Sequence, residues 1–113
     1  MSRKNISMQN LDSIGTQIRQ LREKAEMPLR KLASLLDLDQ STLSKIERDE
    51  RKPNIILIEQ IAKIFNVEKS SLLVAFYSDV VAYEIQEESS FSEILQVAEA
   101  KIEYQRTNPK KVK

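Results

Sequence analysis

Residues that break helices are nearly absent from this chain, and this limits its fold more than any other feature. The 113 residues include one glycine, Gly15, and three prolines. Leu, Ile, Ala, Lys, Glu and Gln dominate instead, and their side chains lose little rotamer freedom in a helix. The sequence therefore predicts an all-α fold. A single glycine also cannot form the glycine-rich loop with which nucleotide-dependent enzymes hold phosphates.

The chain also lacks residue types on which many enzymes depend. It contains no cysteine and no histidine. Their absence from the sequence excludes disulfides, thiolate zinc sites and histidine acid–base chemistry. We therefore expect no metal, no cofactor and no enzymatic activity. No apolar run approaches the roughly 20 residues of a membrane span, so we expect a cytoplasmic protein without a membrane partner.

Charge divides the chain, although its formal net charge is only +1. Residues 1–52 carry 11 Lys and Arg against 8 Asp and Glu, whereas residues 53–108 carry 4 against 9. Three lysines follow in the last five residues. A basic first half and an acidic second half indicate two surfaces with different partners.

Apolar residues recur at helical spacing along most of the sequence. They predict helices at 12–24, 28–36, 40–48, 55–65 and from about residue 69. Asp39 and Asn54 are predicted N-caps. Residues 79–88 fit either a helix or a strand, and we favour helix because no partner strand is visible elsewhere. Ser90 and Glu93 have the spacing of a capping box, which predicts the start of a last helix.

The segment 32–47 has the spacing of a helix-turn-helix. Two short helices flank the turn 37–39, and the small Ala33 lies where they would cross. Apolar residues of both helices would fill the angle between them: Leu32, Leu36, Leu43 and Ile46. The outward residues of the second helix are polar and none is acidic, as a helix in the major groove of DNA requires.

Residues 12–73 resemble the lambda-repressor/Cro family of helix-turn-helix domains, also called the XRE family. The resemblance rests on three segments, which are IGTQIRQLREKAEM, LRKLASLLDLDQSTLSKIERDERKP and IEQIAKIFNVEKSSLL. It implies a five-helix domain, operator DNA as the target and usually a homodimer that reads two half-sites about one helical turn apart. The chain departs from the family pattern at Pro28-Leu29, where a capping Ser or Thr and a phosphate-binding Gln are usual, and at Asp37, the usual turn glycine.

The resemblance also implies roles for individual residues. Base contacts are expected at the exposed start and outer face of the recognition helix, from Gln40, Ser41, Ser44 and Lys45. Contacts to the DNA backbone, which set register without reading sequence, are expected from Thr42, Arg48, Arg51, Lys52 and Arg30. Arg22 and Glu47 are expected to form a structural ion pair between the first and third helices.

Excess apolar residues outside the helix-turn-helix predict an interface. The fourth helix carries three of them where a domain of this type normally meets solvent, and the C-terminal extension carries stripes of its own. The predicted interface residues are Ile56, Leu57, Ile64, Phe76, Val80, Phe91 and Leu95. We predict a homodimer formed by the fourth and fifth helices together with the extension.

These observations predict an organisation and a function. The expected parts are a flexible N-terminus (1–10), a helix-turn-helix DNA-binding domain (11–77), a helical extension for dimerisation (78–106) and a basic disordered tail (107–113). The expected function is sequence-specific transcription regulation by a homodimer on a palindromic operator in double-stranded DNA, with restriction-modification or phage genes as targets. The alternative is an antitoxin-type module whose acidic residues 79–103 bind a basic partner protein.

Overall fold

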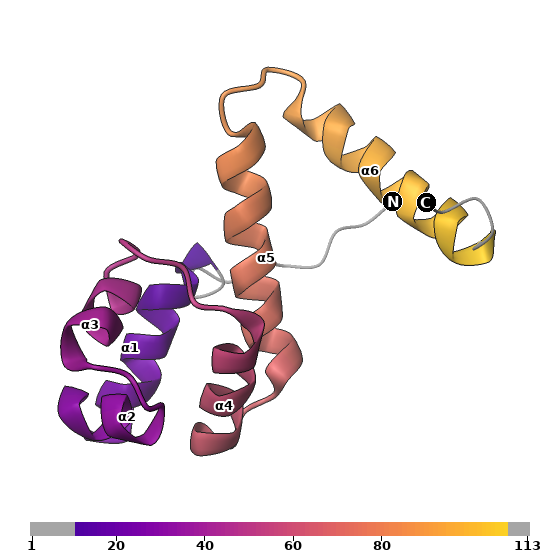
Figure 1. Ribbon diagram of the computed structural model, residues 1–113. Coiled ribbons are helices and arrows are strands. Elements are labelled where there is room, and N and C mark those ends of the chain that lie inside the picture. The colour runs from indigo at the N-terminus through magenta and orange to yellow at the C-terminus, as the bar shows by residue number, and fades with distance from the viewer. Residues whose placement is uncertain (1–10, 109–113) are drawn as a thin grey trace. The chain divides into compact units, whose positions relative to one another are not determined.

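The computed structural model describes residues 11–108, and all regular structure within that range is helical. The helices are α1 (Ile14–Lys24), α2 (Leu29–Leu35), α3 (Gln40–Glu47), α4 (Ile55–Phe65), α5 (Lys69–Ile85) and α6 (Phe91–Thr107) (Figure 1). The predicted all-α fold with a helical extension is confirmed. Residues 79–88 form the last turns of α5 and the turn after it, not a strand. The predicted flexible N-terminus (1–10) and residues 109–113 of the predicted tail lie outside the described residues.

Contacts divide the described residues into an N-terminal unit that ends at Val80 and a C-terminal unit that begins at Val81. The boundary between the units falls within α5, which runs from Lys69 to Ile85. The sequence-based boundary between 77 and 78 lies slightly before the boundary between the units. Helix α6 includes Thr107, so it continues just past the predicted extension. No helix in the described part of the chain is long and apolar enough to cross a membrane.

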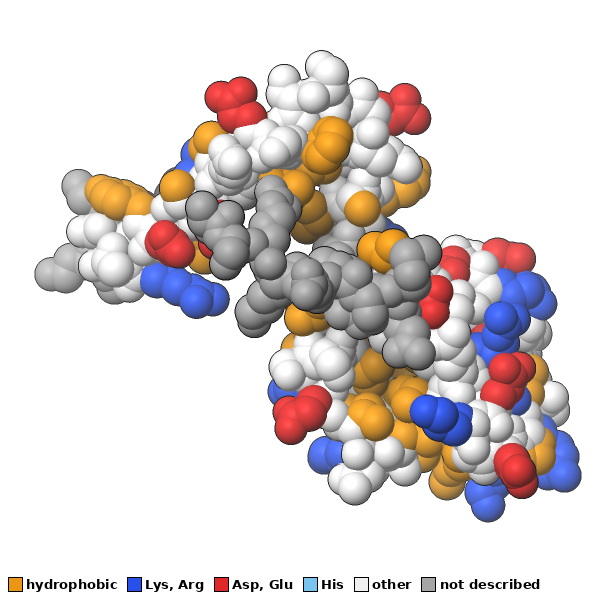
Figure 2. All heavy atoms as spheres, turned by 180° about the vertical axis from the view of Figure 1, so that it is seen from behind, with side chains coloured by type: hydrophobic (Ala, Val, Ile, Leu, Met, Phe, Trp, Pro, Cys, Tyr) orange, Lys and Arg blue, Asp and Glu red, His pale blue; other side chains and the backbone are white. Residues whose placement is uncertain are grey.

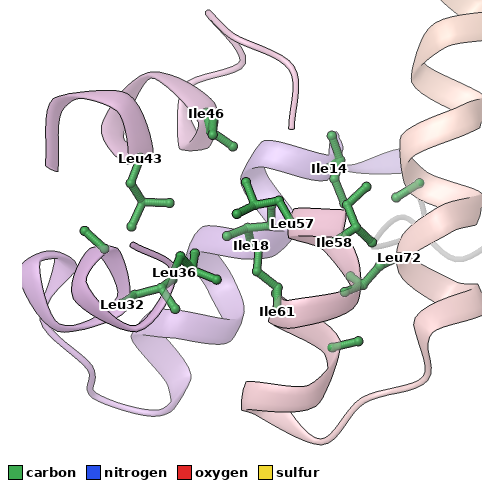
Figure 3. Packing of buried hydrophobic residues seen from close by; sticks show 13 residues of the cluster. Ile14, Ile18, Leu32, Leu36, Leu43, Ile46, Leu57, Ile58, Ile61 and Leu72 are labelled. Carbon is green, nitrogen blue, oxygen red and sulfur yellow. The ribbon is translucent and has the colours of Figure 1, made fainter. Parts of the chain in front are cut away.

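The core of the N-terminal unit consists of aliphatic side chains from α1 to α5 (Figure 3). Its largest fully buried members are Ile18, Leu32, Leu43, Ile58 and Ile61. Burial of one such side chain contributes about 1.5–3 kcal/mol relative to exposure. All four residues predicted to fill the angle of the helix-turn-helix belong to this core. The recognition helix is therefore attached to the rest of the unit through its apolar face.

Side-chain caps determine where α3 and α4 begin. The Asp39 carboxylate accepts a hydrogen bond from the Thr42 amide at 2.8 Å, and the Asn54 side chain accepts one from the Leu57 amide at 2.7 Å. Both caps satisfy backbone N–H groups that a helix leaves free in its first turn. Asp39 and Asn54 thus act as the sequence pattern predicts.

The capping box predicted at Ser90 and Glu93 is wrong. Helix α6 begins after Ser90, but the Ser90 side chain makes no capping hydrogen bond. Its backbone angles, φ −94° and ψ 24°, are not the extended ones of a capping residue. Only the Ser90 carbonyl is used, accepting a hydrogen bond from the Ile94 amide at 2.9 Å.

One residue of the predicted interface belongs to the core instead. Leu57 is 7% exposed and packs with Ile58 and Ile61, whereas its neighbour Ile56 is 68% exposed. The prediction for Leu57 is wrong because the helical turn brings it to the same inner face of α4 as Ile61. The other predicted interface residues are half-buried (Ile64, Phe76, Val80) or exposed (Ile56, Phe91, Leu95).

Candidate nucleic-acid interface

Helix α3 packs against α1 and α2. Its inner face comprises Leu43, Ile46 and Glu47, which are all buried. Glu47, at 5% exposure, is the one buried charged residue in the described part of the chain. A carboxylate in such a place is stable only if it is paired and hydrogen-bonded.

Arg22 of α1 supplies that pairing. Its Nε donates to Glu47 Oε2 at 2.7 Å and its Nη2 donates to Glu47 Oε1 at 3.0 Å. Its Nη1 donates to the carbonyl oxygen of Met27 at 3.0 Å. The hydrogen bonding to Glu47 raises the pKa of Arg22 despite its partial burial. This two-pronged pair joins α1 to α3, and it brings together the two residues that the resemblance pairs.

At Gly15 the backbone of α1 lies close to the end of α3, a contact that the sequence analysis missed. A Cβ atom at this position would clash with the carbonyl oxygen of Ile46 and lie 2.5 Å from Asp49 Oδ1. The Gly15 amide donates to the same Oδ1 at 3.2 Å, and Ser13 Oγ donates to Asp49 Oδ2 at 2.6 Å. The signal was available: a single glycine beside Ile14, in the first turn of a predicted helix, indicates close backbone packing.

Asp79 makes a second contact that sequence reasoning missed. Its Oδ2 accepts a hydrogen bond from the Ile14 amide at 2.9 Å. Together with Asp49 and Ser13, it satisfies the free amides at the start of α1. A carboxylate is favourable there because the N-terminus of a helix carries partial positive charge. No local pattern indicates this contact, because its partners are 65 positions apart.

The outer face of α3 carries the residues predicted to contact bases. Gln40, Ser41 and Lys45 are exposed, and Ser44 is half-buried. At about 100° per residue they share an arc of about 140°, opposite the buried face. Ser41 Oγ donates to the capping carboxylate of Asp39 at 3.1 Å. A face of amide, hydroxyl and ammonium groups can both donate to and accept from base edges.

Arg48, predicted to contact the DNA backbone, is engaged within the chain. Its Nε donates to Glu50 Oε2 at 3.1 Å, and its Nη1 donates to Ser44 Oγ at 2.7 Å. The hydrogen bond to Glu50 raises the pKa of Arg48 and lowers the pKa of Glu50. Both side chains are more than half exposed, so a phosphate can replace Glu50 at little energetic cost.

The remaining predicted backbone contacts surround α3. Arg51 and Lys52 are exposed in the loop that precedes α4, Arg30 is exposed in the first turn of α2, and Thr42 is half-buried on α3. Elsewhere on the molecule, the face seen in Figure 2 carries interspersed acidic and basic side chains. In sequence, Arg30 precedes Lys31 and Lys52 follows Arg51, whereas Arg51 itself follows the acidic Glu50.

Residues 18–72 match a family model described as Helix-turn-helix. The chain is a member of this family. Two solved structures are also similar to it. One is the restriction-modification controller protein C.AhdI from Aeromonas hydrophila, with 29% identity over 52% of this chain and 89% of that chain, and a TM-score of 0.48. The other is SinR, a master regulator for biofilm formation solved in complex with DNA. It is 33% identical over 53% of this chain and 97% of that chain, and its TM-score is 0.49.

The helix-turn-helix match covers the candidate interface but not the whole chain. It includes Arg22 and all of α2, α3 and α4, and it ends within α5. This match supports the conclusion that the chain is a DNA-binding transcription regulator of the XRE type. Helix α6 lies outside the matched residues. Among curated proteins, none matches this chain.

Proposed function

We propose that the chain is a sequence-specific transcription regulator that inserts α3 into the major groove of operator DNA. The main support for this proposal is that α3 has two faces of different character. Its inner face is anchored by Leu43, Ile46 and the Glu47–Arg22 ion pair, and its outer face is polar and accessible. Gln40, Ser41, Ser44 and Lys45 contact base edges in this proposal.

The proposal assigns a different role to the residues around this face. Arg30, Thr42, Arg48, Arg51 and Lys52 contact phosphates and set the register of the protein on the duplex. Two chains bind a palindromic operator as a homodimer, so that two copies of α3 enter successive major grooves about one helical turn apart. The target genes we expect are restriction-modification or phage genes, including the chain's own.

A gel-shift titration on the chain's own upstream DNA, repeated over a series of salt concentrations, tests the proposal. Affinity should fall steeply with salt, and Gln40→Ala or Lys45→Ala should abolish the preference for this DNA over a scrambled duplex while weak non-specific binding remains. Lys63→Ala is the matched control, because Lys63 is an exposed lysine on α4. Equal wild-type affinity for both duplexes at physiological salt would contradict the proposal.

A further inference from the structure

Helix α6 carries a broad apolar face that is exposed in the described part of the chain. None of its residues is buried. Six large apolar side chains lie on it, with exposed fractions from 38% at Ile94 to 54% at Tyr104: Phe91, Ile94, Leu95, Val97, Ile102 and Tyr104. Hydrophobic side chains of this part of the chain are visible at the surface in Figure 2. Helices in proteins owe most of their stability to the packing of an apolar face, and no residue of this 17-residue helix is buried.

The spacing of three of these residues, together with Ala98, indicates what covers this part of the face. Phe91, Leu95, Ala98 and Ile102 follow one another at alternating steps of four and three residues. This is the spacing with which two helices pack along a common seam. The small Ala98 near the middle of the seam allows two backbones to approach closely. The face therefore fits another helix better than it fits a flat surface or a small molecule.

We propose that this other helix is α6 of a second copy of the chain, packed antiparallel. Phe91 then faces the partner's Ile102, and Leu95 faces the partner's Ala98. The twofold axis repeats both contacts, which gives four layers in which every side chain is apolar. This inference deepens the proposed homodimer by naming the helix that joins the two copies.

The charges on α6 favour the antiparallel direction. In a parallel pair, the flanking residue Lys101 would lie against the partner's Arg106 on both sides of the seam, because these flanking positions meet five residues apart. Like charges at such positions are destabilising. In the antiparallel pair, Lys101 lies beside the partner's Ile94, which its aliphatic stem can cover.

The distribution of charge along residues 84–113 also favours a second copy of the chain as the partner of α6. The four ionisable residues from 84 to 93 are all acidic: Glu84, Glu87, Glu88 and Glu93. Residues 101–113 carry five Lys and Arg against one Glu. Within α6 itself, the first turn carries Glu93 and the last turn carries Arg106, so antiparallel pairing brings the acidic first turn of each copy near the basic last turn of the other. The segment is therefore complementary to itself, as a twofold interface between identical chains requires.

Disulfide trapping tests the direction of pairing, and the absence of cysteine from the chain makes each introduced thiol unique. Phe91→Cys and Ile102→Cys are prepared separately and then oxidised, alone or mixed after co-refolding. The expected result is that the mixture forms a cross-linked dimer and each variant alone does not. Efficient cross-linking of either variant with itself would overturn the antiparallel arrangement. A mixture that does not cross-link would overturn the pairing altogether.

Light scattering on the full chain tests whether a second copy of the chain covers this face of α6. The wild type should have twice the mass of one 13.1 kDa chain, and Leu95→Glu should reduce it to a monomer. Gln96→Glu is the matched control, because it adds the same charge at the adjacent position, about 100° around the helix and outside the seam, and should stay dimeric. A monomeric wild type, a dimeric Leu95→Glu variant, or a monomer that pairs only with a different protein would each overturn the inference.

DNA binding separates this inference from the proposed function. Thermal unfolding should confirm that Leu95→Glu leaves the N-terminal unit folded, since Leu95 contributes nothing to its core. The Leu95→Glu monomer should then keep binding to a single half-site and lose at least tenfold in affinity for the full operator. A chain that dimerises through α6 but does not discriminate between DNA sequences would refute only the proposed function. A sequence-specific monomer would refute only the α6 pairing.

Discussion

Arg22 and Glu47 form a two-pronged ion pair between α1 and α3, and its carboxylate is only 5% exposed. Neither charge can move without leaving the other unpaired in a nearly dry environment. The pair therefore restrains the angle between the two helices more than it adds net stability, since replacement of a buried ion pair by apolar residues is often neutral. Its value for binding DNA lies in holding the outer face of α3 in one orientation.

Arg22→Ala should destabilise the N-terminal unit by about 3 kcal/mol, because it leaves the Glu47 carboxylate buried without its partner. The double variant Arg22→Met, Glu47→Leu should recover most of this loss. Urea denaturation followed by circular dichroism measures both free energies of unfolding. If Arg22→Ala unfolds at the same urea concentration as the wild type, the pair has no structural role.

Gly15→Ala should destabilise the fold by roughly 3 kcal/mol, because overpacking of a close contact forces the backbones apart. The added methyl group meets the Ile46 carbonyl and Asp49 at once, so α3 should also shift and specific DNA binding should weaken. Arg19→Ala, an exposed substitution on the same helix, is the control and should change the free energy of unfolding by less than about 0.5 kcal/mol. Wild-type stability of Gly15→Ala would contradict the close approach.

Glu50→Gln should strengthen DNA binding by about threefold to tenfold at low salt, because it releases the Arg48 guanidinium and removes a negative charge near the DNA phosphates. Glu59→Gln is a closely matched control: Glu59 also forms an exposed ion pair, with Lys69 at 3.3 Å, but on α4 and away from α3. Gel-shift titrations on the same duplex compare the two. Equal effects would mean that Arg48 does not contact the backbone.

Stability should decrease in acid partly through Asp39. Hydrogen bonds, first from Thr42 and then from Ser41, lower the pKa of Asp39 from its ordinary value of 3.8. A carboxyl whose pKa is lowered by folding contributes stability that is complete above the ordinary pKa and is lost as pH falls through the lower, folded value. Thermal unfolding between pH 6 and pH 2 should therefore fall less steeply for Asp39→Asn, which caps without titrating. Parallel curves for the two proteins would refute the role of Asp39.

Local patterns predicted most of the fold. Helix α4 was predicted with its observed bounds because Asn54 caps its start and apolar spacing continues to Phe65, and α3 was predicted within one residue because Asp39 and Leu43 fix its start and its inner face. These signals act over one or two helical turns, where side-chain type decides which backbone groups are satisfied. The helix-turn-helix followed from the same short-range spacing.

Contacts between distant residues were harder to predict. Asp49 and Asp79 cap the start of α1 from far along the chain, and neither carboxylate differs in sequence from a solvated one. The sequence places Leu57 in an interface because domains of this type normally meet solvent at that position, and periodicity alone does not decide which of the consecutive apolar residues of α4 turns inward. The polarity of α3 identified the candidate DNA contacts, but hydrogen bonding between Arg48 and Glu50 depends on the loop that follows.

Each of α1 to α4 is followed by a non-glycine residue with positive φ: Glu26 (55°), Asp37 (58°), Asp49 (63°) and Asn66 (55°). A residue with a Cβ atom has few conformations open to it in this region, so these corners bend far less easily than glycine corners would. The helices around the recognition surface are therefore already oriented in the free protein. Little conformational entropy remains to be lost on association with DNA, and a poorly matched duplex has to deform rather than be accommodated by the protein.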